Sequence, residues 1–138
     1  MNPQVRSKVP SDGFLATAID SLVDSGSSLV LSVSGYRITE PQLIESREIR
    51  FERTTVYRNG WPSREILRAT RPYLAQAKWL TVVSGSPWLE EIREANRELY
   101  PESNTPLGHL HWIVAAEDTT FECLTPSPIV YSGETIDF

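Results

Sequence analysis

Residues 109–125 read HLHWIVAAEDTTFECLT, two apolar runs on either side of the acidic pair Glu117-Asp118. This pattern predicts a β-hairpin whose turn consists of the acidic pair. In that register Trp112 lies opposite Cys123, and the apolar side chains of both strands share one face. A slip of one residue would place them on opposite faces, so we expect this register to hold.

The segment before the hairpin predicts a strand followed by a helix. Residues 79–83 form a short apolar run. Ser86 then suits an N-cap and Pro87 the first helical position, so a helix is expected to begin here and to end before Pro101. Its apolar residues recur at helical spacing and predict a buried stripe. The stripe consists of Leu89, Ile92, Ala95 and Leu99.

Farther upstream, residues 43–58 alternate in character and predict one long strand. The dipeptide at residues 59–60, Asn-Gly, predicts a turn after it. Residues 61–70 favour a helix with a break or kink near Arg71, because Pro72 cannot continue it.

The N-terminal part predicts a helix and a strand. Residues 12–24 carry apolar side chains at helical spacing, with Ser11 as a possible cap and Gly26 beyond the end. Residues 29–34 alternate between apolar and polar or smaller side chains up to Gly35, which indicates a strand.

This order of elements predicts an α+β fold. We expect a single domain with a mostly antiparallel sheet of about five strands and two or three helices packed on one face. The passage from residues 79–83 to 109–116 can add one parallel strand pair. The expected division is a flexible N-terminal segment at 1–10, the α+β domain at 11–131 and a C-terminal tail at 132–138.

Composition excludes several classes of protein. The chain has 138 residues, 40% of them hydrophobic, with a single cysteine and a formal net charge of −5. These values exclude a disordered chain, a collagen-like chain and a disulfide scaffold. The apolar runs are far shorter than the roughly 20 residues of a membrane span, and the N-terminus does not read as a signal peptide. We therefore expect a cytoplasmic protein with no membrane segment.

Charge is segregated along the chain. Residues 47–78 hold eight basic and three acidic residues, a net charge of +5, whereas residues 79–138 hold ten acidic and two basic residues, a net charge of −8. Segregated charge on a small domain can steer a charged protein partner, unless the two blocks pair with each other.

The leading hypothesis is a non-enzymatic protein-binding module that uses no cofactor. The chain has only two histidines and one cysteine, so few side chains of these types are available for acid-base or covalent catalysis. The acidic surface fits a small inhibitor or a toxin-neutralising immunity-type protein with a basic partner. The expected partner-binding residues are Glu90, Glu94, Glu98, Glu117 and Asp118.

Two other functions remain as alternatives. The first is a small metal-dependent hydrolase: His109 and His111 share a strand face, and Glu122 lies diagonally opposite His111 as a third candidate ligand. The second is a binder of single-stranded nucleic acid. It would use three arginines at helical spacing among interleaved aromatic residues, although the acidic chain as a whole makes this partner less favoured. These arginines are Arg64, Arg68 and Arg71.

Overall fold

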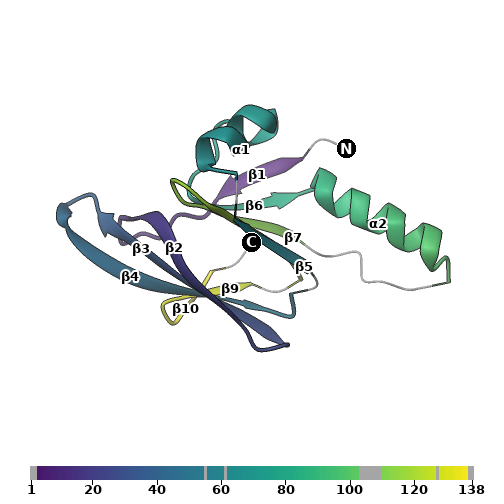
Figure 1. Ribbon diagram of the computed structural model, residues 1–138, viewed down its shortest axis with the longest axis horizontal. Helices are drawn as coiled ribbons and strands as arrows, with labels where there is room; N and C mark the ends of the chain where they lie inside the picture. Colours follow the sequence, from purple (N-terminus) through teal and green to yellow (C-terminus); the bar gives the residue numbers. More distant parts are fainter. Residues whose placement is uncertain (1–2, 55, 61, 103–109, 127, 137–138) are drawn as a thin grey trace.

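The computed structural model describes residues 3–54, 56–60, 62–102, 110–126 and 128–136. Within these ranges the chain forms two five-stranded sheets, two α-helices and one 3-10 helix. The two sheets lie face to face, and the helices lie on the outer side of one of them (Figure 1). The protein is therefore a β-sandwich with a helical layer on one side.

All strand pairings are antiparallel within the described residues. Sheet A contains, in spatial order, β1 Gln4–Ser7, β6 Leu80–Ser84, β7 Leu110–Ala115, β8 Thr120–Thr125 and β5 Val56–Gly60. Sheet B contains β10 Glu134–Ile136, β9 Ile129–Tyr131, β4 Glu40–Glu52, β3 Ser28–Arg37 and β2 Phe14–Asp24. The helices are α1 Arg64–Thr70, the 3-10 helix η1 Pro72–Leu74 and α2 Pro87–Leu99.

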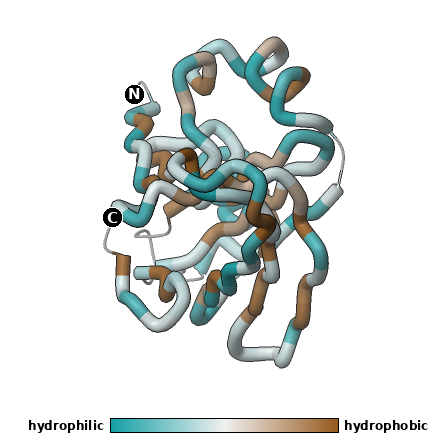
Figure 2. The backbone as a smooth tube through the Cα atoms, turned by 90° about the vertical axis from the view of Figure 1, so that its left-hand side faces the viewer, coloured by the Kyte–Doolittle hydropathy of each residue, from teal (hydrophilic) through white to brown (hydrophobic). Residues whose placement is uncertain are grey.

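The main core lies between the two sheets. Trp79 and Trp112 are 2% and 0% exposed, and they pack with apolar side chains from sheet B. Phe51 from β4 meets Phe121 from β8 with ring centroids 5.1 Å apart. Figure 2 shows hydrophobic and hydrophilic residues alternating along strands, as expected where one face of each sheet is buried.

A second, smaller core lies between α1, η1 and the outer face of sheet A. It contains Leu67, Leu74, Ala77, Val83, Ile113 and Ala115. Helix α2 contributes little to either core, because Leu89 is its one buried residue. The predicted buried stripe is therefore wrong at Ile92, Ala95 and Leu99, which are exposed. Its C-terminal half extends beyond the sheet (Figure 1).

Several predictions for local structure are confirmed. Trp112 pairs with Cys123, and the Ala116 N–H donates to Thr119 O at 3.0 Å, which closes the predicted turn. Helix α2 begins as expected, with Ser86 as N-cap and Pro87 at its start. Helix α1 ends at Thr70, next to the predicted break.

The predicted helix at residues 12–24 is wrong, because this segment is strand β2. Two bulges, between Ala16 and Ala18 and between Ile19 and Ser21, each insert an extra residue opposite β3. The side chains that face the core are consequently two, three and three residues apart in the sequence. This spacing is close to that of one face of a helix, so the sequence pattern alone indicated a helix. These side chains are Phe14, Ala16, Ile19 and Leu22. A Cβ atom on Gly35 would overlap the backbone carbonyl of Leu15, so β2 can lie this close to β3 only because Gly35 lacks a side chain.

The predicted single strand at residues 43–58 is also wrong. The chain leaves sheet B after β4, passes through Arg53 with a φ of 51°, and enters sheet A as β5. The expected turn at residues 59–60 lies inside β5, where Asn59 pairs with Phe121. Alternation alone could not show that the two halves of this stretch belong to different sheets.

The α+β class with mostly antiparallel strands holds, but the architecture differs from the single sheet of about five strands that we expected. The expected parallel pair is wrong, since β6 and β7 are antiparallel. Residues 4–7 and 134–136, in the expected N-terminal segment and C-terminal tail, form the edge strands β1 and β10. None of the helices in the described part of the chain has the length and apolarity needed to cross a bilayer.

Candidate functional site

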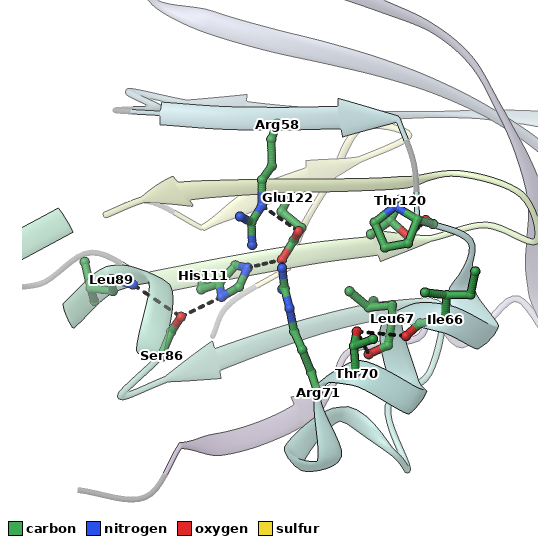
Figure 3. Close-up of polar contacts among 11 residues, drawn as sticks. Arg58, Ile66, Leu67, Thr70, Arg71, Ser86, Leu89, His111, Thr120 and Glu122 are labelled. Atoms are coloured by element: carbon green, nitrogen blue, oxygen red, sulfur yellow. Dashed lines mark hydrogen bonds and ion pairs between the residues drawn. The ribbon is translucent and has the colours of Figure 1, made fainter. Parts of the chain in front are cut away.

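A row of polar side chains crosses the outer face of sheet A. Arg58 on β5 lies opposite Glu122 on β8, and Glu122 lies diagonal to His111 on β7. Successive strand residues point to opposite faces, so Trp112 and Cys123 point into the sandwich while His111 and Glu122 point toward the helices. Ser86, which begins α2, and Arg71, which follows α1, approach this row from the helical layer (Figure 3).

These side chains form one continuous network. His111 Nδ1 lies 2.7 Å from Ser86 Oγ, and His111 Nε2 lies 2.8 Å from Glu122 Oε1. Arg58 Nε donates to Glu122 Oε2 at 2.7 Å, and Arg71 forms an ion pair with Oε1 of the same carboxylate. Figure 3 shows Glu122 at the centre, approached by Arg58, Arg71 and His111.

The charge state of the network follows from burial and hydrogen bonding. Burial alone would raise the pKa of Glu122, but hydrogen bonds from His111, Arg58 and Arg71 outweigh it and lower this pKa to about 2. Burial lowers the pKa of His111 below 6.5, although Glu122 opposes this shift. At neutral pH, Glu122 is therefore ionised and His111 is neutral.

The proton positions follow from these charges. A neutral imidazole has one donor nitrogen and one acceptor nitrogen. Nε2–H donates to the carboxylate of Glu122, so Nδ1 accepts from the hydroxyl of Ser86. Ser86 Oγ in turn accepts from the Leu89 N–H at 3.4 Å, as the N-cap of α2.

The order Ser86, His111, Glu122 resembles the proton relay of a serine nucleophile, but its surroundings do not suit catalysis. Ser86 and His111 are both 0% exposed. A nucleophilic hydroxyl must reach the reacting carbon of a substrate, whereas this one is enclosed and caps a helix. The buried contacts of Ser86 and His111 instead fix the first turn of α2 to sheet A.

Trp88 strengthens that attachment. Its ring meets His111 edge-to-face at 5.1 Å between centroids. The guanidinium carbon of Arg58 lies 4.1 Å from the centroid of the Trp88 ring, a cation–π contact. Ser86, Trp88 and Leu89 thus hold the first turn of α2.

The predicted partner-binding residues lie in two separate places. Glu90, Glu94 and Glu98 are exposed on α2. Glu117 and Asp118 are exposed in the β7–β8 turn, at the end of β7 away from His111 and α2. The structure therefore does not bring the two groups onto one surface.

Two of the three predicted metal ligands, His111 and Glu122, make hydrogen bonds within the protein, and the third lies outside the described residues. His109 is outside the described residues. Both ring nitrogens of His111 are hydrogen-bonded, and the carboxylate of Glu122 is held by two arginines as well as His111. The described ranges contain no cluster of three or more His, Cys, Asp or Glu side chains suited to a metal ion.

The three arginines of the nucleic-acid alternative do not form a free stripe. Arg71 pairs with Glu122, and a guanidinium nitrogen of Arg68 donates to the backbone carbonyl of Ala77. Arg64 lies at the first position of α1. Two of the three guanidinium groups therefore make contacts within the protein.

Sequence reasoning misses three members of the network. The sequence around Ser86 identifies it only as a helix cap, and Arg58 is only one of several basic residues in its segment. Nothing in the sequence distinguishes Trp88 from the other tryptophans. The hairpin register does place Glu122 diagonal to His111, but the order of β8 and β5 in sheet A is needed to bring Arg58 to the same carboxylate.

The chain matches no protein-family model, no curated protein and no solved structure.

Proposed function

We propose that this chain is a non-enzymatic protein-binding module and that the outward part of α2 binds a basic protein partner. The supporting observation is the exposure of this helix. Of the thirteen residues in α2, only Leu89 is buried. Leu99 is 71% exposed, and Tyr100, directly after the helix, is 63% exposed. Exposed apolar side chains beside charged ones are typical of a protein interface.

The outward part of α2 has two adjoining stripes. Glu90, Glu94 and Glu98 recur every four residues and lie along one side of the helix. The apolar stripe beside them runs through Ile92, Ala95 and Leu99. A partner with an apolar groove and a basic rim would complement both stripes.

The charge balance supports a basic partner. Glu90 pairs with Arg93 at 2.7 Å on the helix itself, whereas Glu94 and Glu98 form no ion pair with any described residue. Among the described residues no basic side chain of the segment 47–78 pairs with either of them, and Arg58 and Arg71 of that segment pair with Glu122. In the part of the chain that the structure describes, Glu94 and Glu98 therefore have no cationic partner, and both can meet an external cation.

The finer proposal is a small acidic inhibitor of the toxin-neutralising immunity type. In this role the carboxylates of α2 would cover a basic active site and exclude its anionic substrate. Glu117 and Asp118 lie at the other end of β7, so they would contribute to a partner that extends across sheet A.

An affinity capture with matched variants tests the proposal. Tagged protein is incubated with lysate of the source cells at low and moderate salt, and bound proteins are identified by mass spectrometry. The test variant carries Glu90→Lys, Glu94→Lys and Glu98→Lys. The control variant carries the same change of net charge at exposed sites on other elements, through Glu48→Lys, Glu65→Lys and Glu134→Lys.

We expect one near-stoichiometric basic protein that binds the wild type and the control, is lost as salt rises, and does not bind the α2 variant. The finer role additionally requires that the wild type inhibit an activity of the captured protein. Equal capture by the α2 variant and the control would overturn the assignment of α2.

A further inference from the structure

Two guanidinium groups meet at a single carboxylate on the outer face of sheet A. Arg58 Nε donates to Glu122 Oε2 at 2.7 Å, and Arg71 pairs with Oε1. Both guanidinium groups therefore lie against the same carboxyl group, one at each of its oxygens. Glu122 itself is enclosed, with 3% of its side chain exposed, whereas the side chains of Arg58 and Arg71 are 44% and 24% exposed.

The charges at this place do not cancel. Glu122 is ionised and His111 is neutral, so two positive charges face one negative charge. No second acidic side chain pairs with either arginine in the described part of the chain. The cluster carries a net charge of +1, and its exposed part consists of guanidinium groups.

Two contacts hold the guanidinium group of Arg58 in place. Its guanidinium lies over the Trp88 ring at 4.1 Å, and its Nε is fixed by Glu122. The other two guanidinium nitrogens of Arg58 have no hydrogen-bond partner among the described residues. Contact with the indole removes water from one face of the guanidinium without satisfying these nitrogens, which leaves them free to donate to an anion.

Tyr73 lies near the two arginines and Glu122. It lies on η1, two residues after Arg71, and is half-buried. Burial raises the pKa of its phenol, and the negative charge of Glu122 raises this pKa further. The positive charge of Arg71 lowers it, but the net shift is upward. The phenol therefore keeps its proton at neutral pH.

We propose that Arg58 and Arg71 form a binding site for a small oxyanion, a phosphate or a carboxylate group. The planar guanidinium of Arg58 presents two nitrogens side by side, which matches two oxygens of such a group. Arg71 supplies the second positive charge. This site is separate from the outward face of α2. The site is proposed to bind an anion, whereas the outward face of α2 is proposed to bind a basic protein.

The test is a titration of the full chain followed by NMR. Sodium phosphate is added in one series and sodium acetate in another, at pH 7 and at constant ionic strength kept with sodium chloride. The reporters are the side-chain Nε–H signals of Arg58 and Arg71 and the indole N–H of Trp88. Saturable shifts of these signals are expected with at least one of the two anions. Saturable shifts with phosphate but not with acetate would identify a site for phosphate groups. Saturable shifts with both anions would identify a site that also accepts carboxylate groups.

Matched variants separate a site from general charge effects. Arg58→Gln removes a charge from the proposed site, and Arg50→Gln removes one from an exposed position on sheet B. We expect Arg58→Gln to weaken anion binding roughly tenfold or more, and Arg50→Gln to leave it nearly unchanged. If Arg58→Gln does not fold, as judged by near-ultraviolet circular dichroism, Arg58→Lys takes its place. That variant keeps the charge and loses the planar pair of donors, so partial weakening is expected.

Two results would overturn the proposal. One is the absence of any shift beyond that produced by chloride at the same ionic strength. The other is equal weakening by the Arg58 and Arg50 variants, which would mean that the anions respond only to net charge.

Discussion

His111 on β7 donates from Nε2 to Glu122 on β8 at 2.8 Å, and the same imidazole accepts from Ser86 at the start of α2. This one ring therefore joins the centre of sheet A to the helix that carries the exposed acidic stripe. The connection is fully buried, so its hydrogen bonds do not compete with water. Its members are consequently the residues whose replacement should disturb the fold and the position of α2 together.

Replacing Glu122 with Gln should destabilise the protein. The variant keeps the size of the side chain but removes the charge that holds Arg58 and Arg71. We expect the free energy of unfolding to fall by about 2 kcal/mol, the scale of a hydrogen bond to a charged group. Urea unfolding measures it. Glu48→Gln, at an exposed position of β4, is the matched control and should change stability by less than about 0.5 kcal/mol.

Acidification should reduce stability in two steps. His111 is neutral in the fold because its pKa is depressed below 6.5, so its contribution is complete above about pH 6.5 and is lost as the pH falls through the depressed value. Glu122 has its pKa lowered from 4.5 to about 2, so its contribution is complete above about pH 4.5 and is lost as the pH falls toward 2. Urea midpoints measured between pH 8 and pH 3 check both steps. A constant midpoint between pH 7 and pH 5 would contradict the first, and Glu122→Gln should weaken the second.

The two serine caps offer a matched pair of variants. Ser86 caps α2 and also donates to His111, whereas Ser63 caps α1 by accepting from the Ile66 N–H alone. Ser63→Ala should cost about 1 kcal/mol and affect α1 only. Ser86→Ala should cost about 2 kcal/mol, because it also leaves Nδ1 of His111 without its donor. Hydrogen exchange locates the effects: faster exchange at the start of α2 is expected in Ser86→Ala only.

Leu89 and Leu99 distinguish the anchored end of α2 from the free end. Leu89 is 5% exposed and Leu99 is 71% exposed. Leu89→Ala should lower the free energy of unfolding by about 2–4 kcal/mol, as is usual for a buried leucine. Leu99→Ala should leave stability within about 0.5 kcal/mol of the wild type and yet weaken partner binding. Thermal melting and the affinity capture, applied to both variants, separate the two effects. Destabilisation by Leu99→Ala would show that the helix end is packed.

The sequence by itself determined those features that depend on neighbouring residues. The turn at Glu117-Asp118 set the hairpin register and with it the diagonal position of Glu122 relative to His111. Ser86 and Pro87 set the start of α2, because a cap and a proline act on the backbone beside them. The segregation of charge likewise follows from the order of residues along the chain.

Only the tertiary structure decided the identity of β2, the division of residues 43–58 between two sheets and the membership of the polar network. The bulges in β2 arise from its pairing with β3, and sequence periodicity cannot distinguish them from helical spacing. The exposure of Leu99 depends on how far α2 extends beyond sheet A. Arg58, Arg71, Ser86 and His111 come from four different elements or their flanks, and the order of strands and helices in space brings them together. The physical reason is the same in each case: a hydrogen bond or a buried face depends on which distant segment lies opposite, and local propensity carries no information about that segment.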